Sequence, residues 1–121
     1  MIKAIISGHS KGLGLGIAQA LLSSGYPVLG LSRSTNSVLD QQFPALLQQM
    51  RIDLSESTAL ECKKSSDQLE QFIENATLLL LINNAGLVTP IGPLSAQNPA
   101  DIARSVHLNV TAPMVLCAAL A

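Results

Sequence analysis

The stretch Ile5–Ala18, which reads Ile-Ile-Ser-Gly-His-Ser-Lys-Gly-Leu-Gly-Leu-Gly-Ile-Ala, determines how the rest of this 121-residue chain is interpreted. A short apolar run from Ala4 to Ile6 suits a buried parallel strand and stops at Gly8. From Leu13 onward apolar residues recur at helical spacing, so the turn opens directly onto a helix. The first turn of a helix carries unpaired N–H groups and a partial positive charge, and both attract phosphate. The stretch therefore predicts an anion site between a strand and a helix.

Three glycines have separate roles in this interpretation. Gly8 permits the tight turn, Gly12 lets the backbone approach a pyrophosphate, and Gly14 allows the helix to pack closely on the strand. His9, inside the turn, is expected to order it or to face solvent. The apolar face of the first helix is expected to consist of Leu13, Ile17, Ala20 and Leu21.

The order of residues in the turn separates two kinds of phosphate loop. A nucleoside-triphosphatase loop has glycine, four further residues, glycine, lysine and then serine or threonine. Here Lys11 precedes Gly12 and Leu13 follows it, which excludes that loop. The pattern that remains is Ser-Gly-x-x-x-Gly-x-Gly. Its alternative explanation is a flexible turn before an ordinary amphipathic helix.

A basic residue follows the second expected strand, Val28 to Leu31, which ends in Ser32-Arg33-Ser34. In a dinucleotide-binding fold this strand end lies near the adenosine ribose, where an acid would bind the 2′-hydroxyl and a cation would accommodate a 2′-phosphate. No acidic residue lies near this strand end, whereas Arg33 can form a forked contact with phosphate and Lys11 adds a second charge. The alternative is that Arg33 is a solvated surface residue.

Composition limits the classes of protein to consider. The chain is 48% hydrophobic and carries a net charge of −1, which suits one globular domain over residues 1–121. Because no basic cluster occurs, nucleic acid and anionic membranes are poor candidates as partners. The longest apolar run, Leu78 to Ile82, is too short to span a bilayer, and no leader precedes the first strand, so we expect a cytoplasmic protein. Cys62 and Cys117 are expected to be reduced thiols, and no metal site is expected.

The middle of the chain gives weaker signals. Residues 38–49 predict a short or broken helix, because Pro44 interrupts them. A third strand is expected from Met50 to Leu54, followed by a helix over about residues 58–75. One explanation of Asp53 is that it caps that helix.

A second motif follows the apolar run at residues 77–82, which has no alternation and is typical of a parallel strand buried on both faces. The run ends in Asn83-Asn84-Ala85-Gly86, where two amides can tie the backbone to a neighbouring strand and two small residues let a ligand pass close by. This tetrapeptide and the Ser-Gly-x-x-x-Gly-x-Gly pattern together resemble the two motifs of the short-chain dehydrogenase/reductase family. The resemblance covers nearly the whole chain.

The resemblance implies an α/β fold, a Rossmann-type doubly wound parallel sheet with strand order 3-2-1-4 and helices on both faces. In that order the fourth strand lies at an edge. In the family, a basic residue at the positions of Lys11 and Arg33 marks a preference for NADP(H), and Asp53 accepts a hydrogen bond from the adenine amino group beside Leu54. The residues assigned to the cofactor are Gly8, Ser10, Lys11, Gly12, Leu13, Gly14, Arg33, Asp53, Leu54, Asn83, Ala85 and Gly86.

The fourth helix is expected to begin at Asn98-Pro99, an N-cap followed by a proline in the first turn. Pro113 lacks the N–H that would bond the carbonyl of Asn109, so we expect that carbonyl to hold a water. The resemblance gives Asn109 a catalytic role, because such a water belongs to the family's proton relay. The alternative is a proline kink without a role. The inward-facing stripe of this helix is expected to consist of Ile102, Val106, Asn109, Pro113 and Cys117.

The family's chemistry also requires a serine, and a tyrosine followed four residues later by lysine. Tyr26 is the one tyrosine of this sequence, and Gly30 follows it four residues later. We therefore expect the cofactor-binding half of a larger subunit, inactive alone, from a homo-oligomeric NADP(H)-dependent reductase of a ketone, aldehyde or diketone. Leu87 to Leu94 is loosely similar to the sepiapterin and benzil reductase branch. The alternatives are a catalytically inactive module that binds or senses NADP(H) and acts through protein partners, and a fragment that binds nothing.

Overall fold

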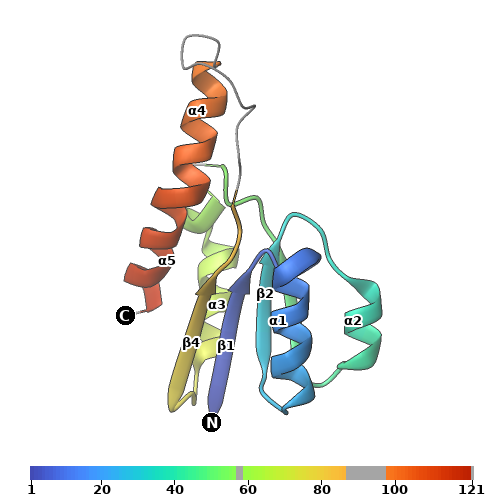
Figure 1. Cartoon of the computed structure of the whole chain (residues 1–121). Helices are drawn as coiled ribbons and strands as arrows, with labels where there is room; N and C mark the ends of the chain where they lie inside the picture. Colours follow the sequence, from blue (N-terminus) through green and yellow to red (C-terminus); the bar gives the residue numbers. More distant parts are fainter. Residues whose placement is uncertain (57–58, 87–97, 121) are drawn as a thin grey trace.

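A computed structural model describes residues 1–56, 59–86 and 98–120. Within them, parallel strands form one sheet in the order β3-β2-β1-β4 (Figure 1). The strands are β1 (Ile2–Ser7), β2 (Val28–Ser32), β3 (Leu47–Arg51) and β4 (Leu78–Asn83). The predicted Rossmann-type topology is confirmed, and β4 lies at an edge of the described sheet as expected.

Helices lie on both faces of this sheet (Figure 1). The α-helices are α1 (Gly12–Ser23), α2 (Ser37–Gln42), α3 (Lys63–Ile73), α4 (Pro99–Val106) and α5 (Ala112–Leu120). A 3-10 turn η1 (Ala59–Glu61) precedes α3, and a π-helical turn η3 (His107–Thr111) joins α4 to α5. In this part of the chain, no helix has both the length and the apolar character needed to cross a membrane.

Two apolar clusters hold the layers together. Because successive side chains of a strand point to opposite faces, neighbouring residues of β1 belong to different clusters. Ala4 and Ile6 pack with residues of α1 and α2, whereas Ile5 packs with residues of α3 and α5. All three β1 side chains are fully buried. The core therefore lies on both sides of β1 and β2.

The face through which α1 packs matches the expected one only in part, because Ile17 and Leu21 contact the core while Leu13 and Ala20 are exposed. Its buried residues are Gly14, Ala18 and Leu22. A Cβ added at Gly14 would collide with the Gly8 carbonyl, so α1 starts in direct contact with the turn. This close approach turns small side chains toward the sheet and leaves Leu13 73% exposed. The helix ends at Ser23, and Gly25 follows it with a φ of +86° and an N–H that donates a hydrogen bond to the Leu22 carbonyl (3.0 Å), which together form a glycine cap.

The bounds of β3 and α3 also differ from expectation. β3 begins at Leu47, because Gln48 and Gln49 pair with β2 despite the weak strand preference of glutamine. The next helix begins only at Lys63, where Cys62 is extended and serves as the N-cap. The expected short helix in residues 38–49 is present as α2, which ends before Pro44.

The predicted start of α4 is confirmed, because the Asn98 side chain accepts a hydrogen bond from the Ala100 amide at 2.8 Å. The predicted inward stripe is wrong. Val106 and Asn109 are exposed, and Ala112 and Leu116 are the buried residues. In the π-helical turn the Ala112 amide donates to the carbonyl five residues back, that of His107. The extra residue in this turn changes which side chains after α4 face the sheet.

Candidate functional site

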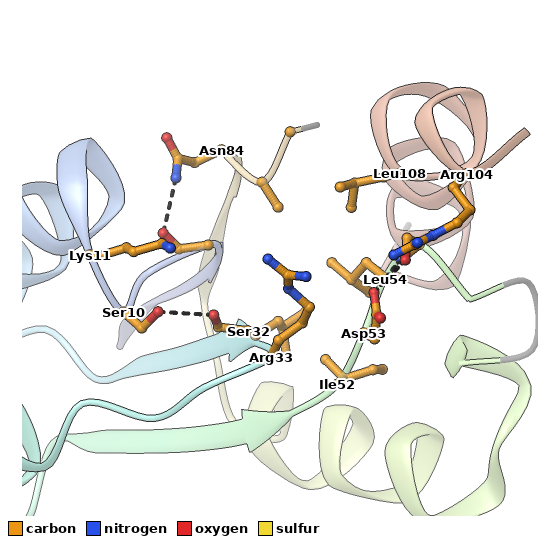
Figure 2. Close-up of a pocket in the computed structure, with 15 residues that line it drawn as sticks. Ser10, Lys11, Ser32, Arg33, Ile52, Asp53, Leu54, Asn84, Arg104 and Leu108 are labelled. Carbon is orange, nitrogen blue, oxygen red and sulfur yellow. Dashed lines mark hydrogen bonds between the residues drawn. The ribbon is translucent and has the colours of Figure 1, made fainter. Parts of the chain in front are cut away.

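A pocket of about 230 Å³ opens at the carboxyl ends of the strands, where open parallel sheets bind ligands (Figure 2). Its wall comes from the glycine-rich turn, from the segments after β2, β3 and β4, and from α4 and η3. The lining residues are Gly8, Ser10, Lys11, Leu31, Ser32, Arg33, Ile52, Asp53, Leu54, Ser55, Asn84, Ala85, Gly86, Arg104 and Leu108.

Backbone geometry at the glycine-rich turn matches the roles predicted for its glycines. Gly8 has φ +74°, and a Cβ there would lie 2.9 Å from Asn84 Nδ2. Gly12 has φ +62°, and a Cβ there would meet nothing within 4 Å, so this backbone is open. At Gly14, by contrast, an added Cβ would collide with the Gly8 carbonyl oxygen. Gly8 thus allows both the turn and the close approach of Asn84, Gly14 allows the helix to pack closely, and Gly12 leaves space at the helix start.

The end of β4 is tied to the turn by the second motif. The Ser7 hydroxyl accepts hydrogen bonds from the amides of Asn84 and Ala85, each at 3.0 Å. The Asn84 side chain donates to the Gly8 carbonyl at 3.0 Å. Asn83 was expected in the site, but its side chain is exposed and points toward the Cys117 sulfur, 3.9 Å away. Asn84 replaces it in the pocket wall, because successive residues at a strand end face opposite ways.

Charged side chains of both signs face the pocket. Arg33 extends between the glycine-rich turn on one side and Asp53 with Arg104 on the other (Figure 2). Hydrogen bonds from Ser55, through its hydroxyl (2.6 Å) and its amide (3.0 Å), lower the pKa of Asp53, and the charges of Arg33 and Arg104 lower it further. Asp53 therefore presents an ionised carboxylate to a mainly cationic pocket.

Asp53 does not cap α3, which begins ten positions later at Lys63. Its carboxylate instead closes a tight turn onto Ser55, two residues on. The capping explanation is wrong, and the side chain stays on the pocket wall beside Leu54.

Within the glycine-rich turn, His9 is fully buried, so the possibility that it faces solvent is excluded. Its Nε2 atom lies 2.7 Å from Gln49 Oε1, and Nδ1 has no hydrogen-bond partner among the described residues. Burial lowers the pKa of His9, and the bond to Gln49 offsets part of that effect. The ring occupies the space beside Gly30, where a Cβ would collide with it.

The sequence model of the short chain dehydrogenase family matches residues 3–121. The chain belongs to this family. Its fold superposes on the crystal structure of a short-chain dehydrogenase/reductase from Burkholderia vietnamiensis with a TM-score of 0.94 at 45% identity, over 98% of this chain and 55% of that one. A short-chain dehydrogenase from Sphingobium yanoikuyae in complex with NADPH is 26% identical, with a TM-score of 0.81 over 100% of this chain and 48% of that one.

Among curated proteins, the benzil reductase ((S)-benzoin forming) of Bacillus subtilis strain 168 is 35% identical over 117 residues, covering 93% of this chain and 44% of the relative. The chain thus spans about half the length of the short-chain dehydrogenases that it matches. Because the characterised relatives are dehydrogenases and reductases, the chain belongs to a family of oxidoreductases.

Not every predicted site residue of this short-chain dehydrogenase chain reaches the pocket. Leu13, Gly12 and Gly14 lie beside it without lining it. Asn109 lies on η3, donates from its side chain to the Ser105 hydroxyl at 3.2 Å, and has its Oδ1 atom 3.4 Å from the position of a Cβ at Gly86. It is thus a neighbour of the pocket rim. The Leu87–Leu94 segment lies outside the described residues.

Arg104 and Leu108 line the pocket although the sequence did not indicate them. They lie four residues apart on α4 and η3, and therefore on one helix face. Spacing alone could have paired them, but it could not have shown which strand end that face meets. This depends on how α4 packs against the segment after β3.

Proposed function

We propose that this chain forms the NADP(H)-binding part of an oxidoreductase that reduces the carbonyl group of a ketone, aldehyde or diketone. The observation that carries the proposal is the position of Arg33 and Lys11 in one pocket beside the start of α1, with no acidic residue directly after β2, where one would bind a ribose 2′-hydroxyl. The names of the benzil reductase relatives support a diketone as one possible substrate class.

The start of α1 fits a pyrophosphate. The N-cap, Lys11, makes no side-chain bond to the helix, and the first turn contains no acidic residue. The amides of this turn therefore keep their hydrogen-bonding capacity and their partial positive charge for an anion. Gly12 leaves space for the approach, which a side chain would take away.

The two ends of the pocket suit the two ends of adenosine 2′-phosphate. Arg33, Lys11 and the Ser10 hydroxyl would hold the 2′-phosphate, since a guanidinium binds phosphate through paired hydrogen bonds. Asp53 would accept a hydrogen bond from the adenine amino group, with Leu54 against the ring. Solved structures similar to this chain include complexes with NADPH and with NADH. The preference of this chain for one of the two cofactors therefore depends on the side chains of its own pocket.

The bound cofactor would supply a hydride to the carbonyl carbon. The described residues would bind the cofactor and orient it, and the Asn109 carbonyl would hold a water of the proton relay. The 121 residues contain no tyrosine followed four positions later by lysine, so we expect no turnover by this chain alone. Homo-oligomerisation and a cytoplasmic location of the intact protein are part of the same proposal.

Titration with NADPH and NADH, followed by thermal unfolding or calorimetry, tests the proposal. Arg33→Ala is expected to weaken NADPH binding by about tenfold or more, because a charge-assisted phosphate contact is lost, and to change NADH binding little. Arg51→Ala is the matched control, since Arg51 is exposed at the end of β3 and does not line the pocket. A wild-type chain that binds neither dinucleotide, or an equal loss for both in Arg33→Ala, would contradict the proposal.

A further inference from the structure

A hydrogen-bond network behind the pocket connects the glycine-rich turn to the loop that carries Arg33. On β3, Gln49 Oε1 contacts His9 Nε2 at 2.7 Å and accepts from the Asn36 amide at 2.8 Å. The Gln49 side chain also donates to the Asn36 carbonyl at 3.1 Å. One glutamine side chain therefore holds both segments, although it does not line the pocket itself.

The backbone of Asn36 fixes the orientation of the Gln49 amide. Because Asn36 offers one donor and one acceptor, the Gln49 oxygen must face the donor and its nitrogen the acceptor. The oxygen that also contacts His9 can only accept, so His9 carries its proton on Nε2. The other ring nitrogen, Nδ1, is then the unprotonated one, in agreement with the lack of an acceptor for an Nδ1 proton among the described residues. The network is therefore consistent with a neutral His9 in one tautomer.

The loop between β2 and α2 is also held from the turn side. The Asn36 side chain donates to the Ser10 carbonyl at 3.1 Å and caps α2 by accepting from the Leu39 amide at 2.9 Å. The Ser10 hydroxyl lies 3.0 Å from that of Ser32 and 3.2 Å from that of Ser34. Ser32 and Ser34 flank Arg33, so the backbone on both sides of this arginine is fixed to the glycine-rich turn.

We propose that Gln49 is a positioning residue that sets the distance between Arg33 and the glycine-rich turn, and thereby the preference for a 2′-phosphorylated dinucleotide. This inference rests on the proposed function. A pyrophosphate and a 2′-phosphate of one molecule can contact the turn and Arg33 together only if those two segments keep a constant separation. His9, Gln49 and Asn36 supply the rigid connection, and Arg33 supplies the contact.

The packing around His9 shows why the connection is built from these residues. The imidazole fills the space beside Gly30, where β2 has no side chain, and so reaches across β2 to Gln49 on β3. Any side chain at position 30 would occupy that space. The combination of histidine in the turn, glycine on β2 and glutamine on β3 therefore acts as one unit.

The test compares Gln49→Leu with Gln48→Leu. Both residues are on β3, but Gln48 is exposed and takes no part in the network. The dissociation constants of NADPH and NADH are measured for each variant and for the wild-type chain. Gln49→Leu is expected to reduce the preference for NADPH over NADH by about tenfold, and Gln48→Leu to leave it unchanged. If the role of Gln49 were purely structural, the variant would weaken the binding of NADPH and of NADH equally. The ratio of the two dissociation constants would then stay constant, and that result would overturn the inference.

A second variant and a spectroscopic measurement cover the case in which Gln49→Leu does not fold. Gln49→Met keeps nearly the volume of the side chain and loses its hydrogen bonds to His9 and to the Asn36 backbone, so it is expected to reduce the preference by a similar factor. Nitrogen NMR of the wild-type His9 ring must show the Nε2–H tautomer, and the Nδ1–H tautomer would overturn the network without any ligand. A wild-type chain that binds neither dinucleotide overturns the proposed function, whereas a wild-type preference retained in Gln49→Leu or Gln49→Met overturns this inference alone.

Discussion

The strands β1 and β4 pair along their whole length, residue for residue from Ile2 opposite Leu78 to Ser7 opposite Asn83, yet their environments differ. In β1 the central side chains are fully buried, whereas in β4 Leu78 is 52% and Leu80 is 37% exposed. The central residues of both strands are aliphatic, so composition does not cause the difference. β1 has a strand on each side, and β4 has one only on the β1 side among the described residues. An apolar strand thus indicates a position within a sheet, while its burial depends on its neighbours.

The largest expected effect is on the free energy of unfolding, when one aliphatic side chain is shortened in β1 and, separately, one in β4. Ile5→Ala is expected to lower the free energy of unfolding by about 2–5 kcal/mol, because it leaves a cavity in a fully packed site. Leu80→Ala is expected to cost clearly less, since solvent already reaches this side chain. Urea unfolding of both variants measures the difference. Equal losses would mean that β4 is covered in solution, and a loss for Leu80→Ala that grows with protein concentration would identify a second copy as the cover.

A smaller effect is expected where β2 meets the glycine-rich turn. Gly30→Ala should destabilise the fold by about 1–3 kcal/mol, because its Cβ would collide with the His9 ring. The matched control is Gly16→Ala on α1, where a Cβ meets nothing within 4 Å, and it should stabilise the fold by about 0.5–1 kcal/mol through helix propensity.

A double-mutant cycle separates this collision from a general effect of altering β2. In the His9→Ala background, Gly30→Ala should lower the free energy of unfolding much less than in the wild-type chain, because the imidazole ring that the new Cβ would contact is absent. Additive losses in the double variant would show that Gly30 and His9 do not interact.

The contrast between the two strands also explains how far the sequence could predict this molecule. The turn between β1 and α1, the glycine stop at Gly25 and the N-cap Asn98 were predictable, because each depends on residues close together in the chain. The start of β3 was not, because Gln48 and Gln49 become strand by pairing with β2.

The pocket shows the same division. Its glycine-rich turn and Arg33 follow from local motifs, and the structure brings them together. Arg104 enters the pocket from a helix far along the chain, and the choice of Asn84 over Asn83 depends on how the end of β4 meets Ser7. The hydrogen-bond partner of the buried His9 is a residue of β3, which only the folded sheet places beside the turn. Contacts between distant elements therefore account for what the motifs did not show.

The smallest effect concerns pH and compares the buried His9 with Asp53 on the open pocket wall. Burial lowers the pKa of His9 below its ordinary value of 6.5, so the unfolded chain binds a proton there before the folded chain does. The free energy of unfolding contributed by His9 is therefore fully present above pH about 6.5 and falls as the pH drops toward the folded-state pKa, by at most about 1.4 kcal/mol per pH unit. His9→Gln should flatten the dependence of the free energy of unfolding on pH in this range.

The pKa of Asp53 is also lowered, but from an ordinary value of 3.8. Asp53→Asn should therefore alter the pH dependence of the free energy of unfolding only at more acidic pH. Urea unfolding at a series of pH values measures both profiles, and an unchanged slope below pH about 6.5 in His9→Gln would show that the imidazole is open to protonation in the folded chain, contrary to its burial behind the turn.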